Sequence, residues 1–265
     1  MTKKIMLDPG HGGHDPGAVA NNLKEKDLVL KIAKKTKAIL EKVYGASVKL
    51  TRSTDVYIDL SQRARLANNW GADYFASIHI NAGGGTGFET FRFDKLSAAS
   101  STGKQQKIVH DSIYKKIKEK TGDRGTKSKN LAVLRETKMP AILTENLFID
   151  RKEDAALLKQ DSFLDVLADG HAAGIAAAVG LKKVSSLSKP SPTPKGVKMA
   201  VVKPNVDGWL WVYDKPSWSA KHKKVKPGEA FTIDKMVTVN GAKMYKLKSG
   251  LYITAATKYV QVKQK

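Results

Sequence analysis

Short apolar segments alternate with amphipathic ones over the first two thirds of the chain. Runs such as Ile5–Leu7, Val48–Thr51 and Tyr74–Ile80 are rich in β-branched, aromatic and other apolar residues, which favours strands. Between them, Asp27–Val43 repeats apolar residues at helical spacing, carries lysines on the opposite face and stops before Gly45. This alternation predicts an α/β domain, a mostly parallel twisted sheet with helices on both faces.

The same pattern extends this domain to residue 181. Further strands are expected at Phe88–Phe93, Leu131–Leu134 and Ala141–Thr144. Further helices are expected from a Ser61 cap through Leu66 and Ala67, and over Gln105–Lys120, Lys152–Lys159 and Ser162–Val179. In such sheets, functional sites lie at the carboxyl ends of the strands, so residues that follow strand ends are the first candidates for chemistry.

The pattern changes after residue 181. Residues 182–197 alternate proline with serine and lysine, a composition that favours an extended, semi-stiff linker. From residue 198 to 265, short strand-like runs are separated by turn dipeptides, and Asn240-Gly241 between Val237–Val239 and Met244–Leu247 predicts a β-hairpin. We therefore expect a small all-β domain of the SH3-like type after the linker.

Composition narrows the choice of partner and site. With 47 Lys and Arg against 25 Asp and Glu, the net charge of +22 favours a polyanionic partner, either nucleic acid or an acidic wall polymer. Cysteine is absent, which excludes disulfides and cysteine-ligated zinc. No apolar run approaches the roughly 20 residues of a membrane span, so we expect no membrane insertion. The apolar stretch near Met1 is too short for a signal peptide, so no export signal is expected.

Four residues in these positions carry candidate chemistry. His11 lies in a glycine-rich turn after the first strand, Glu25 precedes the first long helix, and His79 and Glu145 lie at the ends of two later strands. Each has an ordinary structural interpretation by itself; Glu25, for example, complements the helix dipole. Together, two imidazoles and a carboxylate can hold Zn²⁺ with one position open, and a second carboxylate can take a proton from water bound there.

The segments around these residues occur in a specific order along residues 3–180. They are Asp8–Gly13, Asp15–Ala18, Glu25–Asp27, Leu50–Arg52, Arg63–Asn68, Ser77–Asn81 and Val133–Arg135. This set resembles the zinc-dependent N-acetylmuramoyl-L-alanine amidases of the amidase type 3 family. The resemblance implies cleavage of the amide between the lactyl group of muramic acid and L-alanine in peptidoglycan.

The resemblance also implies roles for single residues. His11, Glu25 and His79 match the family's zinc ligands, and Glu145 matches its catalytic glutamate. Asn81 and Arg135 are candidates for substrate contacts. The family usually continues the catalytic glutamate with a small residue, Gly and Phe, whereas this chain has Asn146-Leu147-Phe148. The pocket wall beside Glu145 is therefore expected to differ.

The C-terminal segment suggests how the enzyme is used. Between residues 198 and 265, fourteen lysines accompany four acidic residues. The stretch from Gly250 to Val260 resembles the SH3-like wall-binding modules of phage endolysins. We therefore expect peptidoglycan and anionic wall polymers, not nucleic acid, as partners. The expected location is the host cytoplasm until a holin opens the membrane, and the cell wall thereafter.

Alternative interpretations remain open at this point. The first is a host autolysin of the same activity, which would normally carry an export signal. The second is a zinc peptidase that cuts the stem peptide, and the third is a basic binding protein whose zinc site is lost. Codons for Lys195–Met199 can also spell a ribosome-binding sequence just before Met199. A free C-terminal domain starting at Met199 could then associate with the full-length enzyme.

Overall fold

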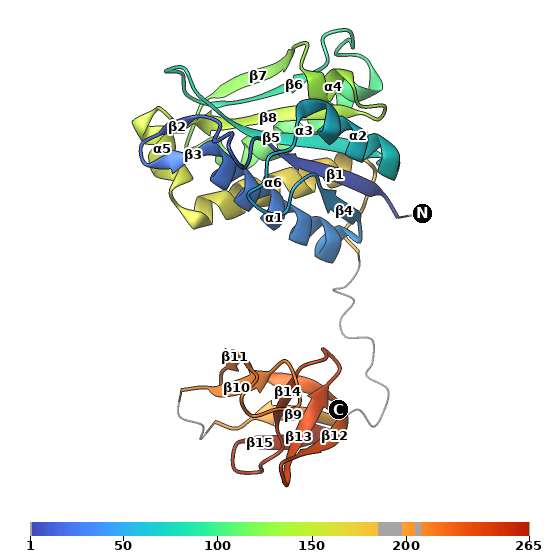
Figure 1. The fold of residues 1–265 in the computed structure, drawn as a ribbon, viewed down its shortest axis with the longest axis vertical. Coiled ribbons are helices and arrows are strands. Elements are labelled where there is room, and N and C mark those ends of the chain that lie inside the picture. Colours follow the sequence, from blue (N-terminus) through green and yellow to red (C-terminus); the bar gives the residue numbers. More distant parts are fainter. Residues whose placement is uncertain (1, 185–197, 205–207, 265) are drawn as a thin grey trace. The chain divides into compact units, whose positions relative to one another are not determined.

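The chain forms two compact units, Met1–Ser186 and Leu187–Lys265 (Figure 1). The computed structural model describes residues 2–184, 198–204 and 208–264. Most of the expected linker, residues 185–197, lies outside the described residues, as does Lys195–Val197 of the proposed internal start. Within the described ranges, no helix combines the length and apolar character needed to cross a membrane.

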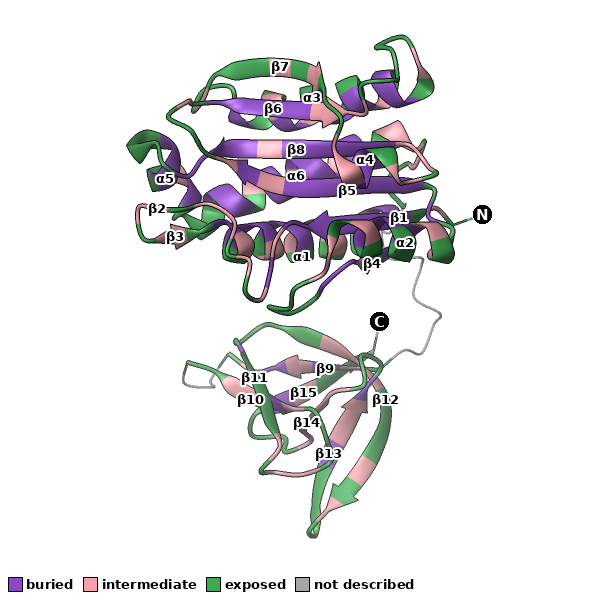
Figure 2. Cartoon of the chain, turned by 45° about the horizontal axis from the view of Figure 1, so that its top comes forward, coloured by how far each residue is buried: buried purple, intermediate pink, exposed green. Residues whose placement is uncertain are grey.

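A six-stranded mixed sheet forms the centre of the first unit. Its strands, in spatial order, are β4 (Ser47–Leu50), β1 (Lys4–Pro9), β5 (Tyr74–Asn81), β8 (Ala141–Phe148), β6 (Phe88–Arg92) and β7 (Asp123–Ser128). β4, β1, β5 and β8 are parallel, whereas β6 runs antiparallel to β8 and β7 runs parallel to β6. The expected mostly parallel sheet is confirmed. Figure 2 shows β1, β5 and β8 buried and the edge strand β7 largely exposed.

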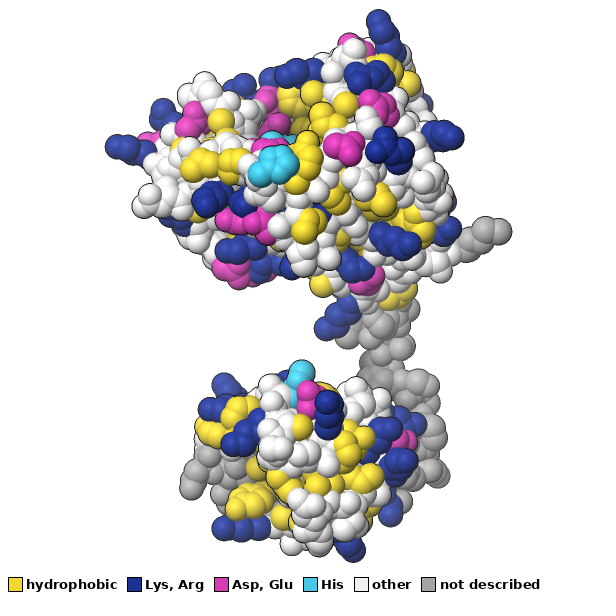
Figure 3. All heavy atoms as spheres, viewed as in Figure 1, with side chains coloured by type: hydrophobic (Ala, Val, Ile, Leu, Met, Phe, Trp, Pro, Cys, Tyr) yellow, Lys and Arg dark blue, Asp and Glu magenta, His cyan; other side chains and the backbone are white. Residues whose placement is uncertain are grey.

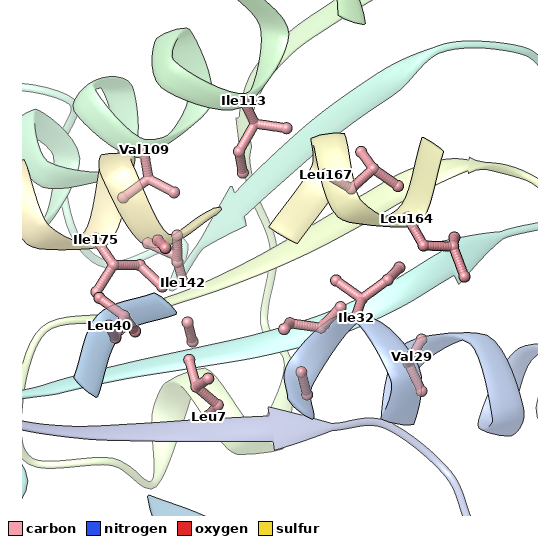
Figure 4. Close-up of a cluster of buried hydrophobic side chains, with 14 of the residues drawn as sticks. Leu7, Val29, Ile32, Leu40, Val109, Ile113, Ile142, Leu164, Leu167 and Ile175 are labelled. Atoms are coloured by element: carbon pink, nitrogen blue, oxygen red, sulfur yellow. The ribbon is translucent and has the colours of Figure 1, made fainter. Parts of the chain in front are cut away.

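Helices cover both faces of this sheet because its central strands are apolar on both sides. α1 (Glu25–Tyr44), α3 (Ser101–Ile117) and α6 (Asp161–Ala178) pack on one face, where Leu7 and Ile142 point into the cluster shown in Figure 4. α2 (Leu60–Trp70) and α4 (Ala132–Arg135) pack on the other, against Met6, Phe75 and Leu143. Successive strand residues thus alternate between two hydrophobic clusters.

Smaller elements complete the unit. A small antiparallel sheet of β2 (Val19–Ala20) and β3 (Leu23–Lys24) precedes α1, and α5 (Lys152–Leu158) follows β8. The strand expected at Leu131–Leu134 is wrong, because these residues lead into helix α4, whose Val133 and Leu134 are buried. A four-residue apolar run does not separate a strand from a short buried helix. α2 is capped by Asp59, whose side chain accepts from the Gln62 amide at 2.7 Å, and not by Ser61.

The second unit is an antiparallel sheet of seven strands. In spatial order they are β11 (Lys221–Val225), β10 (Leu210–Tyr213), β14 (Tyr252–Thr254), β13 (Ala242–Leu247), β12 (Ala230–Val239), β9 (Lys198–Val202) and β15 (Val260–Gln264). The β12–β13 hairpin is confirmed: Asn240 and Gly241 have φ of 48° and 80°, as a type I′ turn requires. A separate core that includes Val212 and Ile253 holds this small all-β unit together. The SH3-like assignment stays a prediction.

Candidate active site

Strand register places the predicted residues beside one another at one edge of the first unit's sheet. His79 on β5 is directly opposite Glu145 on β8, and Glu145 is opposite Glu89 on β6. β1 ends at Pro9 next to Ile78 of β5, so the loop carrying His11 starts at the same edge. Residues of β5, β8 and β6 and the loop after β1 therefore meet at the edge where the parallel strands end.

His11, Glu25 and His79 form a compact cluster. Glu25 Oε1 lies 3.1 Å from His11 Nε2 and 3.0 Å from His79 Nδ1, and one potential ligand atom from each of the three residues lies within 4.8 Å of the others. The Ile80 amide donates to Glu25 Oε1 at 2.9 Å and the Ala18 amide donates to Oε2 at 3.0 Å. The structure thus brings together the three residues expected to be metal ligands.

The other ring nitrogen of His11, Nδ1, contacts a second carboxylate. His11 Nδ1 lies 2.8 Å from Asp15 Oδ2, so the ring can donate there and leave Nε2 with a free lone pair. A carboxylate on the outer nitrogen is the usual arrangement for a metal-bound histidine, because it fixes the ring's orientation and tautomer. Asp15 belongs to Asp15–Ala18, one of the segments that carry the family resemblance. Its contact with His11 could not be predicted from the sequence.

Two glycines make the cluster sterically possible. A Cβ at Gly10 would lie 2.2 Å from Cε1 of the His79 ring, and one at Gly17 would lie 2.6 Å from Glu25 Oε2 and 2.7 Å from Cδ2 of His11. The backbone can approach the side chains of the cluster this closely only where it carries no side chain of its own.

The electrostatics of the cluster favour a charged Glu25. Burial alone would raise the pKa of Glu25, but its contacts with His11 and His79 hold that pKa far below its usual range. Burial likewise tends to lower the pKa values of both histidines, and the adjacent Glu25 carboxylate outweighs burial and raises them. A negative charge between two imidazoles is a ready site for a cation.

Glu145 has the opposite character. Its side chain is half-buried, and within the described structure its buried Oε2 has no hydrogen-bond partner. Burial raises the pKa of Glu145 to about 7, partly offset by the nearby His79. A carboxyl group that titrates near neutral pH can both take up and release a proton there.

Two cavities flank the histidines. One, of about 350 Å³, is bounded mainly by apolar residues including Tyr57, Ile58 and Val133; the other, of about 400 Å³, contains Glu145 and Asn81. The Asn81 amide donates to Glu89 Oε1 at 2.7 Å. Arg135, by contrast, is absent from both cavity walls and binds Asn130 Oδ1 at 2.6 Å and Glu136 Oε1 at 3.1 Å. Substrate contacts by Asn81 and Arg135 stay predictions.

Two buried arginines support the loop that carries His11. Arg63 forms an ion pair with buried Asp8 at 2.8 Å and donates to the carbonyls of Pro9 and His11, both at 2.8 Å. Arg52 donates to the carbonyl of Pro9 at 3.0 Å and to that of Gly10 at 2.7 Å. Both arginines lie in segments that carried the family resemblance, but their roles become visible only in the fold.

Glu89 is a further buried charge that was not anticipated. Its Oε2 accepts from Arg124 at 3.0 Å and from Lys127. Burial would raise its pKa, but the hydrogen bonds with Lys127 and Arg124 lower it, so Glu89 is ionised. The sequence feature that could have indicated a buried charge is the glutamate between the phenylalanines of Phe88–Phe91.

The unusual residues after Glu145 form a bulge. Two residues of β5 after His79 face three residues of β8 after Glu145, so one extra residue is inserted there. The Asn146 amide donates to the carbonyl of His79 at 2.9 Å, and Asn146 Oδ1 lies 2.9 Å from His171 Nε2. Burial lowers the pKa of His171 to about 3, so this histidine is neutral. Asn146 thus connects the bulge to β5 and to α6.

Leu147 is the strained member of this bulge. It is fully buried but has φ of 71°, in the left-handed region that favours glycine. We expect Leu147→Ala to destabilise the first unit by about 2–5 kcal/mol, because it leaves a cavity. Leu147→Gly should be less destabilising than Leu147→Ala by about 1 kcal/mol, the reverse of the usual order, because glycine relieves the strain. Calorimetric melting of both variants measures the difference; equal melting temperatures would argue against strain.

Comparison with known proteins identifies the family. The sequence profile of the N-acetylmuramoyl-L-alanine amidases matches residues 5–177, and a profile described as a domain of unknown function (DUF5776) matches residues 195–260. The endolysin of Bacillus phage SPP1 is 62% identical over 272 aligned residues that cover all of both chains. The sporulation-specific N-acetylmuramoyl-L-alanine amidase of Bacillus subtilis (strain 168) is 50% identical over 184 residues, covering 69% of this chain and 71% of that protein.

Solved structures agree with these relatives. The catalytic domain of CwlV, an N-acetylmuramoyl-L-alanine amidase from Bacillus (Paenibacillus) polymyxa var. colistinus, matches with a TM-score of 0.64 at 33% identity, covering 68% of this chain and 100% of that one. An N-acetylmuramoyl-L-alanine amidase from Clostridium difficile 630 matches with a TM-score of 0.64 at 37% identity, covering 68% and 97%. The expected family, fold and enzyme class are confirmed. The chain belongs to the N-acetylmuramoyl-L-alanine amidase family.

Proposed function

We propose that this chain is an endolysin that cleaves the amide between N-acetylmuramic acid and L-alanine in peptidoglycan, with Zn²⁺ held by His11, Glu25 and His79. The observation that carries the proposal is the convergence of these three side chains, with their ligand atoms within 4.8 Å, beside the buried carboxyl group of Glu145. Full-length similarity to a phage endolysin supports the biological setting.

The donor set fits zinc. Two imidazole nitrogens and one carboxylate oxygen form a typical zinc site that leaves a position for water or substrate. Asp15 on the outer nitrogen of His11, at 2.8 Å, supplies the support that such ligands need. When bound, Zn²⁺ supplies a Lewis acid that makes a coordinated water easier to deprotonate and polarises the substrate carbonyl.

The chain's own residues then move the protons. Glu145 accepts a proton from the attacking water, the water oxygen forms a bond to the lactyl carbonyl carbon, and the carbon–nitrogen bond breaks. Glu145 returns the proton to the leaving nitrogen of L-alanine. The second proton of the water stays on the new carboxyl group and, at neutral pH, ends on the L-alanine amine. The products are therefore a lactyl carboxylate and a protonated L-alanine amino terminus.

The partners and the location follow from charge and from the phage relative. Figure 3 shows Lys and Arg side chains on the visible faces of both units, with few Asp or Glu on the second. Such a surface attracts anionic wall polymers. We propose synthesis in the host cytoplasm, release by a holin and action at the wall, with wall binding by the second unit. Association with a free C-terminal domain starting at Met199 belongs to the same proposal.

Metal removal and product analysis test the function. We expect the purified protein to contain stoichiometric zinc, to lose turbidity-clearing activity with a chelator and to regain it with Zn²⁺. The new amino termini should be L-alanine, whereas a stem-peptide peptidase would expose other residues. Glu25→Gln should lose both zinc and activity, while Glu41→Gln, a change on the exposed face of the same helix, should keep both. Full activity of the metal-free protein would contradict the proposal.

A further inference from the structure

Only one of the two cavities beside the histidines reaches Glu145. Both are bounded by His11, His79, Leu131 and Leu143, which separate an apolar cavity of about 350 Å³ from a polar one of about 400 Å³. A substrate whose scissile bond lies over the histidines therefore extends one arm into each cavity. Glu145 belongs to the wall of the polar cavity and not to that of the apolar one.

The position of Glu145 decides which arm enters which cavity. We propose, resting on the function proposed above, that the stem peptide occupies the polar cavity, that the glycan occupies the apolar one, and that Lys129 binds a carboxylate of the stem peptide. The nitrogen that leaves belongs to L-alanine, and it must come within hydrogen-bond reach of the group that protonates it. Since Glu145 is that group, the alanine arm lies on its side.

The wall of the apolar cavity suits a sugar. Tyr57 and Leu60 line it and expose 46% and 58% of their surface, so both offer apolar area to a ligand. The ring of His14 lies against that of Tyr57, with the centroids 4.1 Å apart and the planes tilted by 33°. Aromatic faces pack well against the C–H groups of a pyranose ring, because those faces carry partial negative charge.

The wall of the polar cavity has one cation that its neighbours do not engage. The carboxylates of Glu25 and Glu89 are bound, the first to the histidines and the second to Arg124 and Lys127. Lys129 lines the cavity and is exposed, and no ion pair or side-chain hydrogen bond of its ammonium group occurs among the described residues. Its backbone is held in place, with the amide donating to the Arg92 carbonyl at 2.9 Å.

An ammonium group that is free to bind in the wall of a substrate cavity matches a ligand carboxylate. The ligand class is therefore a peptide that carries a free carboxylate close to its L-alanine. Lys127, two residues earlier on the chain, is bound to Glu89 and does not offer the same charge.

Paired substrates test the role of Lys129 in the full-length zinc enzyme. Two synthetic muramyl tripeptides would differ only in whether the second residue carries a free carboxylate or a carboxamide. We expect kcat/KM of the wild type to be about tenfold higher for the free acid, and Lys129→Met to reduce this ratio to about one. Lys34→Met removes an exposed lysine of α1 and should keep the wild-type ratio. An unchanged ratio in Lys129→Met, or no preference in the wild type, would overturn the role of Lys129.

A second pair of substrates tests the placement of the glycan. Tyr57→Ser should raise KM about fivefold for a muramyl peptide and much less for the matching lactoyl peptide, which lacks the sugar. Equal effects on both substrates, or a larger effect on the lactoyl peptide, would place the glycan elsewhere. Failure of the proposed function has a different signature, since the wild type would then release no L-alanine amino termini from any of these substrates.

Discussion

Glu145→Gln is expected to lower kcat by about 10²–10⁴-fold, the usual contribution of a positioned general acid–base group. Glutamine keeps the shape of the side chain but cannot accept the proton of the attacking water. The effect should fall on kcat and not on zinc content, because Glu145 lies beside the cluster of His11, Glu25 and His79 and does not belong to it. Initial rates on a soluble muramyl peptide, together with metal analysis, measure both quantities.

Stability and pH dependence separate lost chemistry from lost structure. Glu145 buries an oxygen that has no partner in the described structure, so a neutral glutamine should not lower the melting temperature. In the wild type, kcat/KM should fall as the pH drops through the pKa of Glu145, since only the carboxylate accepts a proton. Burial sets that pKa to about 7 and a bound cation lowers it, so the acid limb is expected at or below pH of about 7.

The matched control for this variant is Glu119→Gln, at a carboxylate that is 82% exposed at its side chain. It should retain wild-type kcat and the acid limb, whereas the residual activity of Glu145→Gln should lack that limb. A Glu145→Gln enzyme with more than about a tenth of the wild-type kcat would show that another group carries the proton.

Local sequence patterns were sufficient to predict the main helices and strands of the first unit. The apolar runs at Ile5–Leu7 and Tyr74–Ile80 and the helical spacing in Asp27–Val43 each reflect burial that depends on near neighbours, and all three lie within observed elements. β7 was missed because Asp123–Ser128 is polar and lies at the exposed edge of the sheet, where burial imposes no pattern. α4 was mistaken for a strand because four apolar residues fit either structure.

The candidate site was predictable where the family resemblance names single residues, and less so where charges meet across the fold. His11 follows the end of β1 as expected, but His79 and Glu145 lie inside β5 and β8, because both strands continue beyond the expected ends at Ile80 and Thr144. The structure nevertheless brings these three residues together with Glu25. The pairing of Asp8 with Arg63, 55 residues apart, has no local signature. Such residues hold the loop that carries His11 by long-range hydrogen bonds, which depend on the finished sheet and not on sequence spacing.

Arg63→Met is expected to destabilise the first unit by about 3–5 kcal/mol, because it leaves the Asp8 carboxylate buried without its cation. Asp8 would keep the hydroxyl donors of Thr51, at 2.6 Å, and Ser77, at 2.7 Å, but these do not neutralise its charge. The carbonyls of His11 and Ile58 would also lose their arginine donor, and that of Pro9 would keep only Arg52, at 3.0 Å. Since these carbonyls belong to the His11 loop and the segment before α2, zinc affinity should fall as well.

Calorimetry on the full chain can measure this loss, because the second unit provides an internal reference whose residues are unchanged. For a unit of this size, 3–5 kcal/mol corresponds to a drop in Tm of roughly 6–20 °C.

Arg65→Met is the matched control. Arg65 lies on the same helix, but its side chain is 61% exposed and its ion pair with Asp59 is long, at 3.7 Å. An exposed pair of this kind contributes about 0–1 kcal/mol, so the control should move Tm little. Asp8→Leu combined with Arg63→Met should recover part of the loss, because the unpaired charge is then gone. If the double variant is as unstable as the sum of the two single variants, the Asp8–Arg63 ion pair is not what stabilises this loop.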